Sequence, residues 1–170
     1  MTTNLFTFVS LYRRIVRSTV HVLAKGAAHA EAAGFSTDEM LDWRLIDDMQ
    51  PLRFQLSVVC NFSKQWTARV AGLPVPDDVS VDLDLAGFQA ALAQSERFLD
   101  ALKPDQFAGR DEAPLKVAIA NGAMEPTFPA AQWLTVFATT NLYFHMTTAY
   151  DILRSRGAPL GKVDLFADGL

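Results

Sequence analysis

The sequence predicts an all-α protein, an antiparallel four-helix bundle with a short β-hairpin before the last helix. Four long segments repeat their apolar residues at three- and four-residue steps, which is the period of a helix. Between the third and fourth segments the period changes to two, around an Asn-Gly pair typical of a hairpin turn. Half of the 170 residues are hydrophobic, which is enough for one buried core. We therefore expect a single domain over residues 1–170.

The first helix is predicted from about Leu5 to Ala33. Gly34 ends it, because glycine suits the left-handed backbone that often follows a helix. A short helix should come next, since Ser36 and Glu39 have the spacing of a capping box. In such a box the serine hydroxyl accepts from the Glu39 amide, and the carboxylate accepts from the Ser36 amide.

Prolines mark the ends of the second and third helices. The second begins near Asp48, with Pro51 in its first turn, where a missing N–H does no harm. It ends at a loop rich in glycine and proline, residues 72–78. The third helix spans about Asp84 to Lys103, and Pro104 closes it.

The chain after the third helix changes its period. Three apolar residues alternate with other residues in the manner of a strand: Leu115, Val117 and Ile119. Asn121 and Gly122 favour the positive φ angles of a type I′ turn, and Pro126 confines the second strand to an edge. The fourth helix is predicted from about Pro129 to Arg156, followed by an extended tail.

Composition excludes several classes of protein. The net charge of −4 is mild and the basic residues are spread out, so we expect no nucleic-acid partner. No apolar run approaches the ~20 residues of a membrane span. The N-terminal segment carries its apolar residues before its arginines, the reverse of a secretory signal. A single cysteine, Cys60, excludes an intramolecular disulfide. These features predict a soluble protein of the cytoplasm.

One histidine lies inside the apolar fourth helix and marks the candidate site. Asn141, His145 and Thr148 form a polar strip at helical spacing. A buried polar group without a partner costs about 1–3 kcal/mol, so the strip needs partners from another helix, water or a ligand. The candidate pocket residues are His145, Asn141, Thr148, His29, Asp48 and Gln55. We expect His145 and His29 to be buried and His21 to be exposed.

Three roles are open for His145: a metal ligand, an acid–base catalyst, or a core histidine whose hydrogen bonds are satisfied. A zinc or nickel site on one helix face favours a second histidine four residues away. Those positions hold Asn141 and Ala149. The sequence therefore predicts no metal cofactor, with zinc or nickel as the alternative, and it assigns no catalytic residue.

Cys60 lies on a polar stripe of the second helix with Arg53, Ser57 and Lys64. Two cations near the thiol would lower its pKa and make it reactive. The interpretation that we favour is a small residue beside a solvated helix face, without a special role.

Four segments carry a resemblance to a known family: DDMQPLRFQL, VAIANGAMEPTF, NLYFHMTTAYDILRSRG and PLGKVDLF. They are similar to a bacterial family of unknown function, DUF1993, which is grouped with the DinB/YfiT-like bundles. The resemblance covers nearly the whole chain and implies an antiparallel four-helix fold. Proteins of the wider group are often homodimers, and some are metal-dependent thiol transferases or hydrolases.

In those enzymes one histidine of the second helix and a His-x-x-x-His pair of the last helix hold the metal. The resemblance implies that His145 is the second histidine of the pair, and Asn141 stands where the first would be. The second helix of this chain contains no histidine. Because one of three ligand positions is matched, the resemblance implies the fold and not the metal chemistry.

Three functions follow as hypotheses: a metal-free cavity around His145 that binds a small molecule, a metal-dependent thiol transferase or hydrolase, and a structural or interaction protein with a vestigial site. The fourth helix also has more large side chains than one buried stripe needs. They are Trp133, Phe137, Leu142, Tyr143, Phe144 and Tyr150. We therefore expect a homodimer through the first or last helix that buries at least ~1,000 Å².

Overall fold

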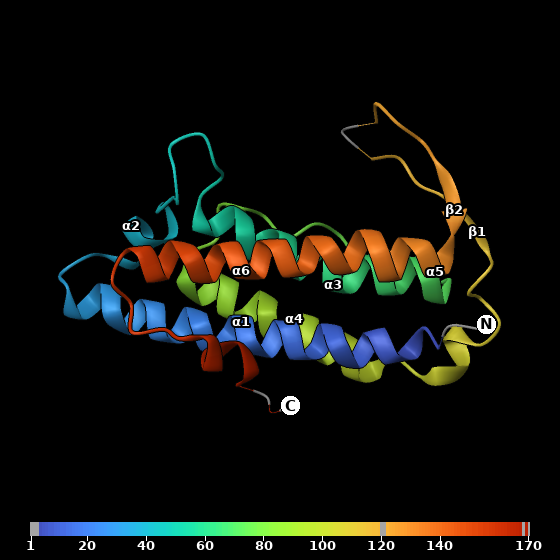
Figure 1. The fold of residues 1–170 in the computed structure, drawn as a ribbon, viewed down its shortest axis with the longest axis horizontal. Helices are drawn as coiled ribbons and strands as arrows, with labels where there is room; N and C mark the ends of the chain where they lie inside the picture. Colours follow the sequence, from blue (N-terminus) through green and yellow to red (C-terminus); the bar gives the residue numbers. More distant parts are fainter. Residues whose placement is uncertain (1–3, 120–121, 168, 170) are drawn as a thin grey trace.

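The computed structural model describes residues 4–119, 122–167 and 169. Its long helices lie side by side as a bundle (Figure 1). They are α1 (Phe6–Ala32), α3 (Leu52–Ala71), α4 (Leu85–Ala101) and a last helix in three parts, α5 (Ala130–Gln132), η2 (Trp133–Ala138) and α6 (Thr139–Ser155). A small hairpin precedes the last helix. The predicted all-α bundle is confirmed.

The long helices pair antiparallel as α1 with α4 and as α3 with α6, whereas α3 and α4 run in the same direction (Figure 1). Parallel neighbours need a connection that returns along the whole bundle. The loop of residues 72–84 makes this return, and it lies along α3. Its path decides which side chains of α3 reach solvent.

The connection from α1 to α3 agrees with the predicted capping box. Gly34 has φ 83° after α1, and α2 (Thr37–Leu41) follows. The Ser36 hydroxyl accepts from the Glu39 amide at 3.2 Å, and the Ser36 amide donates to the Glu39 carboxylate at 2.8 Å. Both predictions for this segment are confirmed.

The start predicted for α3 is wrong by one turn. The helix begins at Leu52 and not near Asp48, and Pro51 is its extended N-cap, with ψ 172°. The residue before a proline avoids helical backbone, so the helix cannot extend upstream. The Leu52 amide donates instead to the Trp43 carbonyl at 2.9 Å, which anchors the loop of residues 44–50.

The start of α4 agrees with the prediction. The Asp84 carboxylate accepts a hydrogen bond from the Gly87 amide in the first turn of this helix. A short 3-10 helix, η1 (Pro104–Phe107), follows α4.

The hairpin is present, but its turn differs from the predicted one. β1 (Pro114–Lys116) pairs antiparallel with β2 (Thr127–Pro129), and an isolated bridge joins Ile119 to Met124. That bridge encloses residues 120–123, more than the two of a type I′ turn. Gly122 has φ 84°, while Asn121 lies outside the described residues.

The last helix contains a π-helical turn, which the sequence did not predict. Over Trp133–Ala138 the helix widens, and the Leu134 carbonyl becomes accessible to side chains. It accepts from the Tyr12 hydroxyl at 2.7 Å and from the Thr139 hydroxyl at 2.8 Å. Burial raises the pKa of Tyr12, so the phenol stays protonated and donates. The turn thereby fixes α1 against the last helix.

The C-terminal tail is helical in part, where an extended segment was predicted. Residues Lys162–Phe166 form η3, a 3-10 helix. Asp164 accepts from His21 and Lys25 of α1, each at 2.8 Å, and from the Gly161 amide at 2.7 Å. These bonds hold the pKa of Asp164 well below its usual range. His21, predicted to be exposed, is therefore half-buried and paired.

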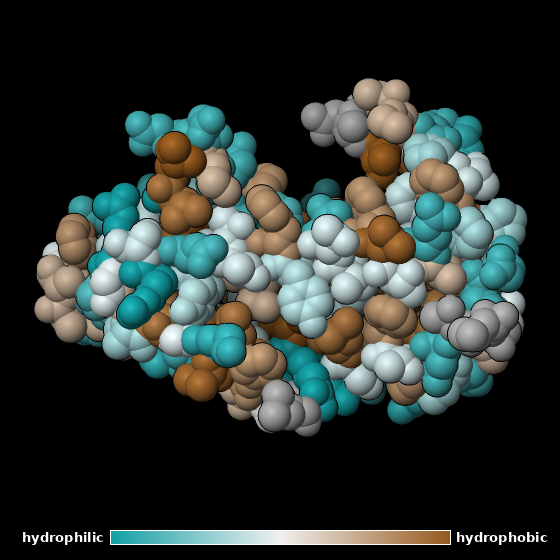
Figure 2. Space-filling view, in the orientation of Figure 1, coloured by the Kyte–Doolittle hydropathy of each residue, from teal (hydrophilic) through white to brown (hydrophobic). Residues whose placement is uncertain are grey.

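Two projections rise from the face of α3 and α6: the loop of residues 44–50 and the hairpin (Figure 1). Between them the surface is hollowed (Figure 2). Trp133 is 1% exposed, since it stacks on Trp66 and its indole N–H donates to the Leu115 carbonyl of the hairpin. Part of the aromatic surplus of the last helix is thus covered within the chain. None of the described helices combines the length and apolar character that crossing a membrane requires.

Candidate functional site

His145 of α6 contacts Gln55 of α3, and both residues belong to the predicted candidate pocket. Its Nδ1 lies 2.7 Å from the Gln55 side-chain oxygen. The Gln55 amide nitrogen donates to the Gln50 carbonyl at 2.9 Å. Gln55 is 2% exposed, whereas His145 is half-buried. A chain of hydrogen bonds therefore runs from the loop before α3 through α3 to the imidazole.

This chain fixes the proton on the ring. A backbone carbonyl only accepts, so the amide nitrogen of Gln55 must face Gln50 and its oxygen must face His145. The neutral imidazole then carries its proton on Nδ1 and leaves Nε2 as an acceptor. Burial lowers the pKa of His145 from 6.5 to about 4, so the ring is neutral at pH 7.

Aromatic rings flank the imidazole. The Phe54 ring centroid lies 5.9 Å from that of His145, and the Phe144 centroid lies 5.1 Å away, both in edge-on geometry. Phe144 is 55% exposed. The site therefore combines one acceptor nitrogen with apolar walls, at the surface of α3 and α6.

The other predicted pocket residues do not join this site. Asn141 donates to the Phe137 carbonyl of its own helix at 2.8 Å, and Thr148 is buried without a bond to His145 or Gln55. Asp48 is exposed and bonds to no other described residue. His29, predicted to be buried, is half-buried and contacts the Arg156 carbonyl at 2.9 Å. That contact ties the ends of α1 and α6 together and is structural.

The side chains at His145 do not suit a zinc or nickel ion. Structural and catalytic zinc sites need at least three nitrogen, sulfur or carboxylate ligands. The described partner of His145 is a carboxamide, Gln55, and Asn141 is bonded to its own helix instead. Over the described ranges, no three His, Cys, Asp or Glu side chains come together as a metal site would require. We therefore derive no chemical step through a metal.

Cys60 is inert in this setting. It is 0% exposed, and burial raises the pKa of its thiol to about 11, against smaller opposing effects of a hydrogen bond with Ser95 and the charge of Lys64. Arg53, the other cation considered, pairs with Asp42 at 2.7 Å. This geometry agrees with the predicted absence of a reactive thiol. It disagrees with the predicted solvated helix face, because Cys60 is buried.

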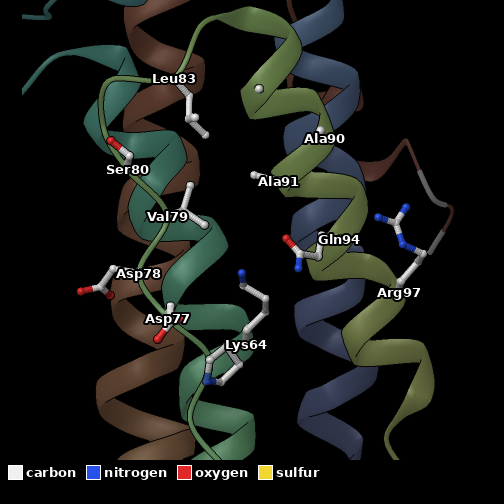
Figure 3. Close-up of a pocket in the computed structure, with 12 residues that line it drawn as sticks. Lys64, Asp77, Asp78, Val79, Ser80, Leu83, Ala90, Ala91, Gln94 and Arg97 are labelled. Atoms are coloured by element: carbon white, nitrogen blue, oxygen red, sulfur yellow. The ribbon is translucent and has the colours of Figure 1, made fainter.

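Apart from Arg53, the polar stripe of α3 is buried, and it borders a cavity that was not predicted from the sequence. Ser57 and Lys64 are each 4% exposed. They lie under the loop of residues 72–84, where an open cavity of about 670 Å³ separates α3 from α4 (Figure 3). A stripe of this composition is usually solvated, and no local pattern indicates that a returning loop covers it. The one available signal was Lys64, an ammonium between two apolar stretches of a helix.

Comparison with known proteins agrees with the fold. A family model described as "Domain of unknown function (DUF1993)" matches residues 6–166. A solved structure, described as a DinB family member protein from Shewanella denitrificans, is similar to this chain with a TM-score of 0.81 and 26% sequence identity. That match covers 96% of this chain and 95% of the other. No curated protein matches the sequence.

Proposed function

The chain belongs to the DUF1993 family and shares the fold of a DinB family member, and from this premise we propose that it is a metal-free binding protein for a small molecule, with His145 as its polar contact. The observation that carries the proposal is the chain of hydrogen bonds from Gln50 through Gln55 to His145. It holds the imidazole in one orientation and one protonation state before any ligand arrives. Such preorganisation lowers the cost of binding.

The chemistry of the site selects a class of ligand. A neutral imidazole with a free Nε2 lone pair accepts a hydrogen bond from a hydroxyl or N–H group. The Phe54 and Phe144 rings favour a flat apolar body beside it. An uncharged aromatic molecule with a hydroxyl group fits both requirements.

A titration with phenol and anisole, followed by NMR of the full-length protein, tests this proposal. The two probes have similar shape, but anisole has no hydrogen-bond donor. We expect phenol to shift the His145 ring signals and anisole to bind several-fold more weakly, as loss of one hydrogen bond predicts. His145→Phe keeps an aromatic ring and should remove the preference for phenol. Equal shifts by the two probes, or no shift at His145, would favour a structural role for this residue.

We also propose that the protein forms a homodimer. Apolar side chains of the last helix remain at the surface: Val136 is 59% exposed, Tyr143 43% and Phe144 55%. A second copy would cover such side chains through a two-fold contact. Sedimentation at micromolar concentration provides the test, and a monomer of 18.7 kDa would contradict the proposal.

A further inference from the structure

The cavity between α3 and α4 has three walls of different origin. α3 contributes Lys64, α4 contributes Gln94, and the returning loop contributes Val79 and Leu83 (Figure 3). Lys64 and Gln94 point into the cavity, whereas the guanidinium of Arg97 points away from it, along the outer side of α4. The cavity therefore presents one cation, one carboxamide and an apolar surface.

Lys64 is the unusual member of this set. Its side chain is 4% exposed, and within the described part of the chain its ammonium makes neither a hydrogen bond nor an ion pair. Lysine is almost never buried unless it is paired. Here the stem is buried while the ammonium opens into the cavity, since Nζ is not among the fully buried polar atoms that lack a partner. The cavity in front of Nζ supplies the space in which a partner can bind.

The loop wall is fixed in place. At Val79 the backbone N–H donates to the Asn61 side chain at 2.8 Å, and the carbonyl accepts from the Ser57 hydroxyl at 2.8 Å. The Gln65 amide donates to the Asp78 carboxylate at 2.8 Å and holds it on the outer side of the loop. Asp78 is therefore engaged by Gln65, and no ion pair joins an acidic side chain to Lys64 within the described residues.

We infer that this cavity binds a small monocarboxylate with an apolar body, whose carboxylate pairs with the Lys64 ammonium. One ammonium and one carboxamide donor match a group with a single negative charge. A phosphate dianion would need further donors to match its second charge. The apolar part would lie on Val79, Leu83, Ala90 and Ala91. A cavity of about 670 Å³ lies within the size range of small-molecule sites.

Hexanoate and 1-hexanol, titrated into the isotope-labelled full-length protein, test this inference. Both carry the same alkyl chain, and only hexanoate carries the charge. We expect hexanoate to shift the amide signals of residues 76–83 and of the facing part of α4, and to bind at least about tenfold more tightly than 1-hexanol. Equal affinities, shifts confined to other regions, or no binding of hexanoate at about 50 mM would overturn the inference.

Two variants locate the charge. Lys64→Met keeps an unbranched side chain without the ammonium and should abolish the preference for hexanoate over 1-hexanol. Arg97→Gln removes a cation that lines the same cavity but points away, and it should leave that preference unchanged. A preference that survives Lys64→Met, or that Arg97→Gln removes equally, would contradict the assignment. Should Lys64→Met fail to fold, Gln94→Leu on the exposed face of α4 must weaken hexanoate binding several-fold, or the inference fails.

Discussion

α3 presents two polar side chains to opposite neighbours, Gln55 to α6 and Lys64 to α4. Their positions differ by about two and a half helical turns, which places them on opposite sides of the helix. Gln55 has a partner on each side of its amide group, the Gln50 carbonyl and the His145 ring. Lys64 is similarly buried as a residue, yet its ammonium opens into the cavity and no described residue bonds to it. The two residues are thus similarly buried, but the polar atoms of Gln55 have hydrogen-bond partners, whereas the Lys64 ammonium has none among the described residues.

The hydrogen-bond chain at Gln55 is complete within the protein, whereas Lys64 lacks a hydrogen-bond partner among the described residues. At Gln55 the protein itself supplies every bond, so only the far nitrogen of His145 remains for a ligand. At Lys64 the protein supplies burial and shape but no counter-charge. Burial alone therefore does not identify a binding site. At Lys64 it is the missing partner beside an open cavity that points to one. The satisfied site should be sensitive to removal of its polar groups, and the unsatisfied site should not.

The largest effect is expected for Gln55→Leu. The substitution leaves the Nδ1–H group of His145 without its acceptor, and we expect the free energy of unfolding to fall by roughly 1–3 kcal/mol. Urea denaturation measures the loss. The double variant Gln55→Leu/His145→Phe should lose less stability than the sum of the losses of the two single variants, because both residues belong to one chain of hydrogen bonds. A loss below about 0.5 kcal/mol would place Gln55 among ordinary surface substitutions.

A smaller effect is expected from pH. The pKa of His145 falls from 6.5 to about 4 on folding, so the unfolded state binds more protons between these values. Stability is therefore complete above pH 6.5 and decreases as the pH falls toward 4. The decrease should be about 1–2 kcal/mol, less than the full pKa difference implies, because the ring is partly exposed. The pH dependence of the wild type minus that of His145→Phe isolates this contribution, and identical curves would disprove it.

Lys64→Met should have the opposite sign. Replacing the unpaired ammonium at the end of this buried stem by an apolar side chain of similar length is expected to leave stability unchanged or to raise it by up to about 1 kcal/mol. Lys64→Ala serves as the control, since it also removes the packing of the stem and should destabilise. Thermal and urea unfolding measure both variants. If Lys64→Met costs more than about 1 kcal/mol, the ammonium has a stabilising partner and the comparison with Gln55 fails.

The smallest effect is expected for Arg97→Gln. This side chain lines the cavity but is exposed and points away from it. We expect a change in the free energy of unfolding within about 0.5 kcal/mol. Urea denaturation measures this change. A larger loss would mean that the positive charge of Arg97 stabilises the bundle although the side chain is exposed.

Helical periodicity and capping chemistry predicted the four long helices, because both signals are local. The Ser36–Glu39 capping box and the start of α4 at Asp84 are examples. Gln55 was among the candidate pocket residues, since a buried polar strip needs partners from another helix, water or a ligand. The predicted contribution of Asp48 failed because Pro51 begins α3 one turn later and leaves Asp48 in an exposed loop.

The unforeseen features depend on contacts between distant parts of the chain. Ser57 and Lys64 were predicted to lie on a solvated helix face, because no local sequence pattern shows that residues 72–84 return over α3. η3 forms where Asp164 meets His21 and Lys25, far away in the sequence. The π-helical turn likewise depends on Tyr12, whose hydroxyl bonds to the Leu134 carbonyl.

That turn, Trp133–Ala138, has a consequence for changes in chain length. A π-helical turn accommodates one residue more than an α-helix over the same distance. Deleting a single residue there would let regular α-helix form over the same distance, because the widened turn absorbs the extra residue without rotating the helix beyond it. Trp133 could then still stack on Trp66 and His145 could still face Gln55, whereas a deletion between residues 139 and 145 would rotate all later side chains by about 100°. The widened turn is therefore a place where the last helix can lose a residue and keep its contacts at both ends of α3.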